Sequence, residues 1–467
     1  MVSAVASTSP RPGDQLELVV TGLNHRAEGV SRLPQGQVCF VPGALPGEVV
    51  RVKLSHPARR HWLAELVAVM QPSEERCRPA CILAARCGGC SLQHWSAQAQ
   101  SQWKQQVVVD ALERIGHLRT FVRPILAAPE PLAYRNRAVI PVERTNEGLL
   151  RAGYYRRGSH RIVNMNRCPV LDPRLDALIA PLKQDLERSG WPASPDAMGE
   201  GGLRHLALRV GRGTGELLIT LISSHDNLPD LDALASRWME RWPSLVGVCL
   251  NLQPRPTNTL MGEFTRTVDG RGWVQEDFAG LRLHIGADTF FQVNTSQAER
   301  VVPLLSQALQ RLRGGRGAGV LVDAYCGIGT YSLPLARDGW QVRGLERNPE
   351  AVRLARLNAD KNKLSERCRF DAVDVDAALA DQLPGSDVLF VDPPRKGLDP
   401  RTLAVVLASP PPVLLYLSCD PATLARDLGL LTERGGYTLE EVQPIDFFPQ
   451  TSHVETLAVL HRKNALA

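Results

Sequence analysis

The stretch LVDAYCGIGTYSLPLA, from Leu321 to Ala336, is typical of a strand, a glycine turn and a helix. Gly327 and Gly329 let the backbone pass close to a ligand, and the helix behind them offers free N–H groups at its N-terminus. Glu346 ends the next apolar run, where a carboxylate can accept hydrogen bonds from ribose hydroxyls. The stretch has neither a third glycine in G-x-G-x-x-G spacing nor a G-K-[ST] motif. It therefore favours S-adenosylmethionine over a dinucleotide or a nucleoside triphosphate.

Strands and helices alternate on both sides of this stretch, from about residue 286 onwards. The expected strands include QVRGLER, DVLFVDPP and VLLYLSC, and helices are expected near 331–337, near 350–361 and over ATLARDLGLL. This alternation predicts a mainly parallel sheet with helices on both faces. Ligands of such sheets bind at the carboxyl ends of the strands. Asp392 closes one strand and Cys419 closes another, so we expect both side chains near the cofactor.

Length and composition limit the other possibilities. A chain of 467 residues is too long for one core and predicts two to four domains. Its net charge of +5, from 54 Lys+Arg against 49 Asp+Glu, is compatible with a polyanionic partner but does not establish one. The start, MVSAVASTSP, lacks the features of a secretory signal, and three prolines divide the longest uncharged run, 402–419. We expect a soluble cytoplasmic protein with no membrane partner and no obligate protein partner.

Two segments before the α/β region contain candidate RNA-binding residues. Residues 14–70 alternate apolar and polar positions between Gly/Pro turns, which predicts a small β-barrel. The basic residues of this segment form either a phosphate-binding patch or an ordinary solvated face, and their charge alone does not distinguish the two possibilities. They are Arg51, Lys53, Arg59, Arg60 and His61. From 134 to about 280 the pattern is again strand-rich, and arginines interleaved with tyrosines favour single-stranded RNA over an ordinary surface. These residues are Arg135, Arg137, Arg151, Arg156, Arg157, Arg161, Tyr134, Tyr154 and Tyr155.

Four of the ten cysteines, Cys77, Cys81, Cys87 and Cys90, lie close together in the sequence. In a reducing compartment such a group indicates metal binding or catalysis rather than disulfides. The spacing C-x5-C-x2-C from Cys81 to Cys90 suits either zinc or an iron–sulfur cluster, both of which accept four thiolates. Cys77 has no assigned role.

Three segments, in this order, resemble signatures of the RNA uracil carbon-5 methyltransferase family. They are DPPRKG at 392–397, LLYLSCDPATLARD at 414–427 and IDFFPQTSHVE at 445–455. The front of the chain resembles a TRAM domain, an oligonucleotide-binding-type barrel. The resemblance implies three parts: this barrel at 11–71, a β-rich iron–sulfur domain at 72–285, and a Rossmann-like class I methyltransferase domain at 286–467. It also implies RNA, most specifically 23S rRNA, as the partner.

The resemblance also assigns residues. Cys419 matches the catalytic nucleophile and Glu455 the base. Gln292, Tyr325, Thr330, Glu346, Asp374 and Asp392 match the S-adenosylmethionine site, and Cys81, Cys87, Cys90 and Cys168 match the ligands of a 4Fe-4S cluster. Asp371 and Asp376 compete with Asp374 for its position. Asp420 stands where the family signature usually has Asn.

The chemistry explains why such residues are needed. Carbon 5 of uracil is a weak nucleophile until a thiolate adds to carbon 6, and a base must later remove the proton from carbon 5. A cysteine that ends a buried strand is by itself more often a small core residue. Two further hypotheses use the same fold: a tRNA uridine methyltransferase, and an RNA-binding assembly factor without activity. A base-N methyltransferase is less favoured, because DPPR lacks the aromatic residue typical of that group and Cys419 would have no use there.

Overall fold

The computed structural model describes residues 9–196, 201–257, 259–313 and 317–462, which form two compact units. The N-terminal unit comprises Met1–Lys104 and Phe448–Ser452, and the main unit comprises Gln105–Phe447 and His453–Ala467. The expected boundaries at 71/72 and 285/286 stay predictions. The end of the predicted 286–467 domain, residues 463–467, lies outside the described residues.

The N-terminal unit contains a six-stranded sheet in the order β1-β5-β6-β4-β3-β2. Its strands are β1 (Gln15–Val19), β2 (Gly22–Leu23), β3 (Glu28–Arg32), β4 (Val38–Pro42), β5 (Val49–Pro57) and β6 (His61–Gln71). Along β5, Val50, Val52 and Leu54 are buried while the residues between them are more exposed, as the sequence alternation predicts. The expected small β domain is thus confirmed as a sheet with its own apolar core.

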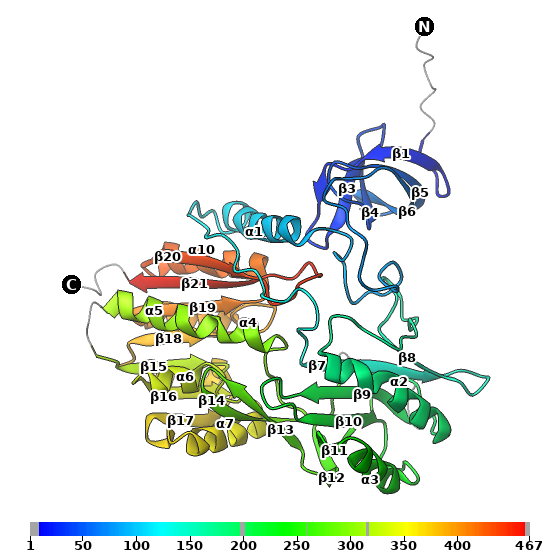
Figure 1. Cartoon of the computed structure of the whole chain (residues 1–467). Helices are drawn as coiled ribbons and strands as arrows, with labels where there is room; N and C mark the ends of the chain where they lie inside the picture. The colour runs from blue at the N-terminus through cyan, green and yellow to red at the C-terminus, as the bar shows by residue number, and fades with distance from the viewer. Residues whose placement is uncertain (1–8, 197–200, 258, 314–316, 463–467) are drawn as a thin grey trace. The chain divides into compact units, whose positions relative to one another are not determined.

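The main unit contains a second six-stranded sheet, in the order β12-β11-β10-β9-β7-β8, and a separate hairpin. The sheet strands are β7 (Arg137–Arg144), β8 (Leu150–Ala152), β9 (Leu203–Val210), β10 (Leu217–Ser223), β11 (Leu245–Leu252) and β12 (Phe264–Gly270). The hairpin strands are β13 (Trp273–Phe278) and β14 (Leu281–Gly286). Two helices accompany this sheet, α2 (Pro173–Arg188) and α3 (Leu231–Arg241) (Figure 1). The earlier helix α1 (Ala97–Arg114) contains the division between the units.

The third sheet has seven strands in the order β17-β16-β15-β18-β19-β21-β20. They are β15 (Val320–Ala324), β16 (Gln341–Glu346), β17 (Cys368–Ala372), β18 (Val388–Val391), β19 (Val413–Ser418), β20 (Tyr437–Ile445) and β21 (Glu455–Arg462). β17, β16, β15, β18 and β19 are parallel, whereas β21 is antiparallel to both neighbours. The mainly parallel sheet is therefore confirmed, and its carboxyl edge also receives the start of β21.

Helices flank this seven-stranded sheet (Figure 1). They are α4 (Thr295–Glu299), α5 (Val301–Arg313), α6 (Ser332–Arg337), α7 (Pro349–Lys361), the short 3-10 helix Ser365–Arg367, α8 (Val375–Gln382), α9 (Pro400–Ala408) and α10 (Pro421–Arg434). Three of them begin with the same local device: an Asx residue caps free N–H groups and a proline follows at the first helical position. The pairs are Asn348-Pro349, Asp399-Pro400 and Asp420-Pro421.

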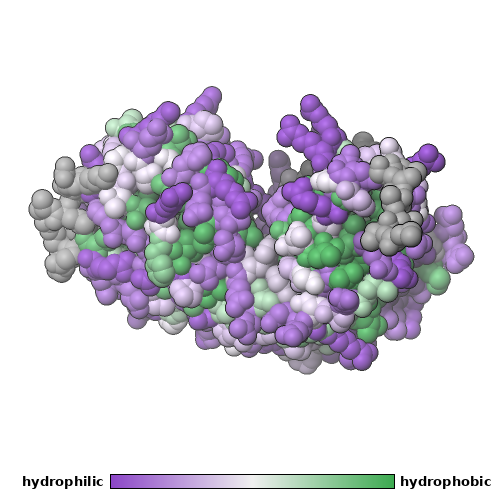
Figure 2. All heavy atoms as spheres, turned by 90° about the horizontal axis from the view of Figure 1, so that it is seen from above, coloured by the Kyte–Doolittle hydropathy of each residue, from purple (hydrophilic) through white to green (hydrophobic). Residues whose placement is uncertain are grey.

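The central strands β18 and β19 are buried at every position, which is expected for parallel strands covered on both faces. Their side chains join a core that includes Leu389, Val391, Leu414 and Tyr416. The face drawn in Figure 2 is largely hydrophilic, with smaller hydrophobic areas between. In the described part of the chain, no helix is both long and apolar enough to cross a membrane.

Candidate functional site

Four predicted residues meet at the carboxyl edge of the seven-stranded sheet. Tyr325, Asp392 and Cys419 each follow directly after one of the adjacent strands β15, β18 and β19. Glu455 is the first residue of β21, which runs antiparallel to β19. Parallel and antiparallel neighbouring strands thus bring the Cys419 thiol, two carboxyl groups and the glycine loop to one edge of the sheet.

The loop after β15 is held in an unusual backbone conformation. Tyr325 has a φ of 76°, and Gly327 and Gly329 have φ values of 55° and 87°. A positive φ is strained for a tyrosine and marks a site where the surroundings impose the shape. The backbone amide of Tyr325 donates to the Leu345 carbonyl at 2.9 Å, and the Gly327 amide donates to Glu346 Oε2 at 3.2 Å. The loop is therefore tied to the end of β16.

Gln292 connects two parts of the main unit. Its Nε2 donates to Asp392 Oδ2 at 3.4 Å, and its backbone carbonyl accepts from Asn136 Nδ2 at 2.8 Å. Phe290, two residues earlier, is 60% exposed although it is aromatic. Phe290 was not among the predicted site residues; the aromatic pair Phe290-Phe291, directly before Gln292, is the signal in the sequence that marks it.

Buried acids dominate the electrostatics of this edge. Burial, and after it the charge of the nearby Asp323, raise the pKa of Asp392 to about 7. Burial also raises the pKa of Asp323 to about 7. Glu455 is only 4% exposed, and burial followed by the charge of Asp392 raises its pKa well above the usual range. Burial therefore shifts the pKa of all three carboxyl groups upward, towards their protonated forms.

The Cys419 thiol is governed by the same surroundings. Burial raises its pKa to about 12, and Glu455 and then Asp392 add to the shift because they disfavour a second negative charge. Arg395 acts in the opposite direction on both Cys419 and Glu455. The Arg395 guanidinium also lies 3.3 Å from His453 Nε2. A cation brought close to this edge would favour the thiolate.

Two buried polar atoms at this edge have no hydrogen-bond partner among the described residues: Asp323 Oδ1 and the Tyr331 hydroxyl. Such orphaned groups indicate a polar ligand that is part of the working site. The charges of Asp392, Glu455 and Asp323 all act on Tyr331. With the glycine loop and Glu346 beside them, these residues fit the polar groups and the positive charge of S-adenosylmethionine.

The remaining predicted cofactor residues are less closely tied to this group. Thr330 is partly buried, just before α6. Asp374 is exposed before α8, makes no capping hydrogen bond, and lies 3.8 Å from Arg347 Nε. The two alternative aspartates form ion pairs, Asp371 with Arg369 and Asp376 with Arg401. The choice of Asp374 stays a prediction.

Asp420 caps α10, as an asparagine could. Its Oδ1 accepts from the amides of Ala422 and Thr423, each at 3.0 Å. Aspartate in place of the usual asparagine at position 420 therefore keeps the hydrogen bonds that follow Cys419. The substitution adds a negative charge, which also contributes to the raised pKa of the thiol.

One part of the RNA-stacking hypothesis is wrong. Tyr134 is 1% exposed, so its ring is part of the core and cannot stack on a base. Tyr154 and Tyr155 are partly exposed, and Arg151, Arg156 and Arg157 are exposed close to them in the chain. Tyr134 and Tyr155 are each followed by an arginine, so an adjacent arginine does not distinguish an inward from an outward tyrosine.

Cys81, Cys87 and Cys90 belong to the N-terminal unit, between β6 and α1, and Cys168 belongs to the main unit. The sulfur atoms of Cys81 and Cys87 accept from the amides of Leu83 and Gly89, each at 3.4 Å. Among the described residues, no three His, Cys, Asp or Glu side chains gather closely enough to hold a metal ion. The four-cysteine ligand set stays a prediction.

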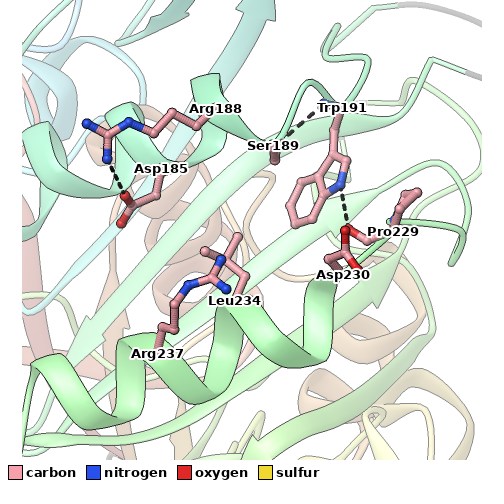
Figure 3. A pocket seen from close by; sticks show the side chains of 8 residues that line it. All are labelled: Asp185, Arg188, Ser189, Trp191, Pro229, Asp230, Leu234 and Arg237. Carbon is pink, nitrogen blue, oxygen red and sulfur yellow. Dashed lines mark hydrogen bonds and ion pairs between the residues drawn. The ribbon is translucent and has the colours of Figure 1, made fainter.

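A pocket of about 370 Å³ lies elsewhere in the main unit, between α2 and α3 (Figure 3). None of the predicted functional residues lines it. Its arginine Arg188 faces Asp185 at 3.6 Å, and the Trp191 indole donates to the Pro229 carbonyl at 3.0 Å. These groups satisfy one another, so the pocket offers no reactive constellation.

Comparisons with known proteins agree with this geometry. The family described as tRNA (Uracil-5-)-methyltransferase matches residues 280–463, and the TRAM domain family matches residues 11–67. A protein of Parasynechococcus marenigrum, named as an uncharacterized RNA methyltransferase, is 50% identical over 98% of this chain and 97% of its own length. One of Synechocystis with the same description is 46% identical over 98% of both chains. The solved tRNA (uracil-54, C5)-methyltransferase of Pyrococcus abyssi, bound to S-adenosyl-L-homocysteine, is 26% identical with a TM-score of 0.73, covering 95% of this chain and 99% of that one.

Proposed function

Because this chain belongs to the RNA uracil-5-methyltransferase family and contains a TRAM domain, we propose that it methylates carbon 5 of one uridine in 23S rRNA through a transient bond to Cys419. RNA methylation with S-adenosylmethionine as the donor follows from membership in the family. The 23S rRNA target, the covalent step and the residue roles are the proposal.

The observation that carries the proposal is the placement of Cys419 and Glu455 at one edge, on neighbouring strands β19 and β21. Charge interaction between them contributes to the raised pKa of the thiol. A nucleophile and a base that serve one uracil ring must lie at the same edge, because they act on adjacent carbon atoms of that ring. A cysteine placed there only for packing would not require a buried glutamate beside it.

Each bond change has a residue to support it. The Cys419 thiol gives up its proton to solvent, its sulfur bonds to carbon 6, and the electrons of the 5,6 double bond move to carbon 5 and the 4-carbonyl. S-adenosylmethionine, when bound, would supply an electrophilic methyl group: carbon 5 takes up the methyl group while the methyl–sulfur bond breaks, its electron pair stays on that sulfur, and S-adenosylhomocysteine leaves. Glu455 then accepts the carbon 5 proton, the ring double bond re-forms, and the thiolate leaves. The raised pKa of Glu455 makes its ionised form a stronger base for this proton.

The test uses RNA that contains 5-fluorouridine, because fluorine at carbon 5 cannot leave as a proton. The purified protein is incubated with S-adenosylmethionine and fragments of 23S rRNA or tRNA. We expect a denaturation-resistant adduct with 23S rRNA that is absent in Cys419→Ala and present in Cys368→Ala. An adduct with neither RNA, together with no methyl transfer, would contradict the proposal and favour a non-catalytic assembly factor.

A second candidate substrate is tRNA. The observation that favours it is the similarity, over nearly the whole chain, to the Pyrococcus abyssi enzyme whose substrate is uracil 54 of tRNA. The same adduct experiment separates the two substrates, since only the true substrate should form the adduct at stoichiometric amounts.

The 4Fe-4S cluster with Cys81, Cys87, Cys90 and Cys168 as ligands is a prediction that rests on the resemblance alone. It is tested by iron and acid-labile sulfide analysis of anaerobically purified protein. We expect about four of each per chain in the wild-type protein and a marked loss in Cys87→Ser. Stoichiometric zinc without sulfide would identify the competing tetrahedral zinc site.

A further inference from the structure

Asp427, on α10, has a fully buried side chain, although this helix begins only two residues after Cys419. Burying a carboxylate costs free energy unless hydrogen bonds satisfy it. The groups that donate to Asp427 therefore show which parts of the structure this carboxylate holds together. Asp427 was not among the residues predicted for the site.

The donors to Asp427 come from a strand, a loop and its own helix. Asp427 Oδ2 accepts from the Tyr416 hydroxyl at 2.8 Å and from the Leu398 amide at 2.9 Å. Asp427 Oδ1 accepts from Arg426 Nε at 2.8 Å. Tyr416 lies on β19, three residues before Cys419, and Leu398 lies in the loop between β18 and α9. One carboxylate thus joins the strand of the proposed nucleophile, the β18–α9 loop and α10.

Two further hydrogen bonds fix the β18–α9 loop to α10. Thr423 Oγ1 donates to the Arg395 carbonyl at 3.1 Å, and Arg426 Nη2 donates to the Lys396 carbonyl at 3.0 Å. Together with the amide of Leu398, these contacts attach the loop at three points to one face of the helix. The backbone that carries the Arg395 side chain is therefore fixed relative to α10.

Gly397 lets the loop come this close to the carboxylate. Its φ is 77°, which a residue with a side chain adopts only with strain. A Cβ atom at this position would lie 2.6 Å from Asp427 Oδ2 and 2.7 Å from Arg426 Nη2. Position 397 therefore has to be glycine for the loop to pack directly on Asp427.

The β18–α9 loop carries a cation that acts on both proposed catalytic groups. The Arg395 guanidinium lies 3.3 Å from the Nε2 atom of His453, two residues before Glu455. Its positive charge lowers the pKa of Cys419 and of Glu455, against the larger effect of burial. A charge interaction weakens with distance, so this effect requires the backbone under Arg395 to be held in place. Formation of the Cys419 thiolate therefore depends on the position of the loop.

We propose that Asp427 is a positioning residue, which holds the β18–α9 loop so that the Arg395 guanidinium stays near Cys419 and favours the attacking thiolate. The inference deepens the proposed function and rests on it for the role of the thiol. With no exposed surface, Asp427 cannot itself contact the RNA and acts only through the groups that donate to it. Tyr416, which is also fully buried, ties the carboxylate to the strand that ends before Cys419. The loop and the sulfur are thereby held by the same group.

The test measures alkylation of Cys419 by iodoacetamide near pH 8 in the protein without RNA, so its outcome does not depend on which RNA is the substrate. Loss of the Arg395 charge raises the thiol pKa and slows the reaction, whereas a loosened fold exposes the thiol and speeds the reaction up. In Asp427→Ala we expect the rate to fall by about three- to tenfold. Asp427→Asn keeps an oxygen that can accept from both Tyr416 and Leu398, and should restore most of the rate.

A double-mutant cycle shows whether Asp427 acts through Arg395. Arg395→Gln alone should slow alkylation at least as much as Asp427→Ala does. Adding Asp427→Ala to Arg395→Gln should change the rate little further, because the charge to be positioned is already gone. Independent effects that multiply in the double variant would overturn the proposal. An alkylation rate in Asp427→Ala equal to or above that of the wild type would overturn it as well.

Asp185→Ala is the matched control for a loss of stability alone. Asp185, on α2, accepts from the indole of the buried Trp238 at 3.0 Å, much as Asp427 accepts from a buried tyrosine. Asp185→Ala should lower the melting temperature but leave the alkylation rate of Cys419 unchanged. A slower rate in this control would show that destabilisation alone produces the effect, and would overturn the proposal.

Thr423→Val decides if Asp427→Ala does not fold. It removes the donor to the Arg395 carbonyl at a partly exposed position and should also slow alkylation, while an unchanged rate would overturn the proposal. Methyl transfer to RNA is measured alongside, and Asp427→Ala should lower kcat with little change in KM, since no RNA contact is lost. Slowed alkylation together with a wild-type protein that methylates no RNA would contradict the proposed function and still support the positioning of the thiol.

Discussion

Ser418 on β19 and Thr456 on β21 are direct partners across an antiparallel strand pair. The residue after Ser418 is Cys419 and the residue before Thr456 is Glu455, so both project from the same sheet edge although 36 positions separate them in the sequence. This register gives the proposed nucleophile and base a common rigid frame. Sites built on strands hold such geometry more precisely than sites on loops.

Replacing the base should trap the covalent complex. In Glu455→Gln, sulfur addition and methyl transfer can proceed, but the carbon 5 proton has no acceptor and the thiolate cannot leave. We expect turnover to fall by about 10² to 10⁴ and a denaturation-resistant adduct to accumulate on ordinary uridine RNA. Gel electrophoresis with labelled RNA measures the amount of this adduct. The double variant Cys419→Ala/Glu455→Gln should form none, and an adduct there would contradict the assignment of the sulfur.

The reactivity of Cys419 should depend on the neighbouring carboxylates. With a pKa raised to about 12, the thiol of the protein without substrate should react slowly with iodoacetamide near pH 8, much more slowly than the exposed Cys77. Asp392→Asn removes a negative charge, lowers the thiol pKa and should raise the alkylation rate several-fold to about tenfold. Peptide mass spectrometry follows both sites in one sample. Equal rates for Cys419 and Cys77 in the wild type would refute the raised pKa.

Asp323 should make stability depend on pH. Its pKa is raised from 3.8 to about 7 in the folded protein, so the folded state holds the proton more tightly than the unfolded state. The stabilisation is complete below about pH 4 and is lost as the pH rises through 7. Asp323→Asn should therefore increase the free energy of unfolding at pH 8, relative to the wild type, on the order of 4 kcal/mol. At pH 4 the two proteins should differ little.

Urea denaturation at both pH values measures the effect of this substitution. Asp360→Asn, at an exposed position of α7, is the control and should show no such pH dependence. A wild-type stability that stays constant from pH 4 to 8 would show that the Asp323 carboxyl ionises without cost.

Asp420 should act through its helix cap. Asp420→Ala leaves the amides of Ala422 and Thr423 without their acceptor and should destabilise the protein by about 1 kcal/mol. Asp420→Asn keeps an oxygen acceptor and should stay close to the wild type. Asp399→Ala, at the start of α9, removes an equivalent cap and should cost a similar amount. If Asp420→Asn lost as much stability as Asp420→Ala, the charge rather than the cap would be responsible.

Much of the methyltransferase region was predictable because local signals agree with each other there. The strand before Asp392 is apolar at every position, the strand before Cys419 is apolar up to its last residue, Ser418, and Asx-Pro pairs mark where α7, α9 and α10 begin. Tyr134 shows the limit of the same reasoning, since alternation with arginine did not reveal that its ring points inward.

The alternation of strands and helices, the glycine turn and the residue types at the strand ends can be predicted from the amino-acid sequence, because periodicity, capping and turn chemistry are local properties. The antiparallel placement of β21 beside β19, the orphaned polar atoms of Asp323 and Tyr331, and the pairing of Arg137 with Arg209 in the strand register became known from the folded structure. Strand register and burial depend on residues far apart in the chain, and the charge interactions that shift a pKa exist only once those residues are packed together.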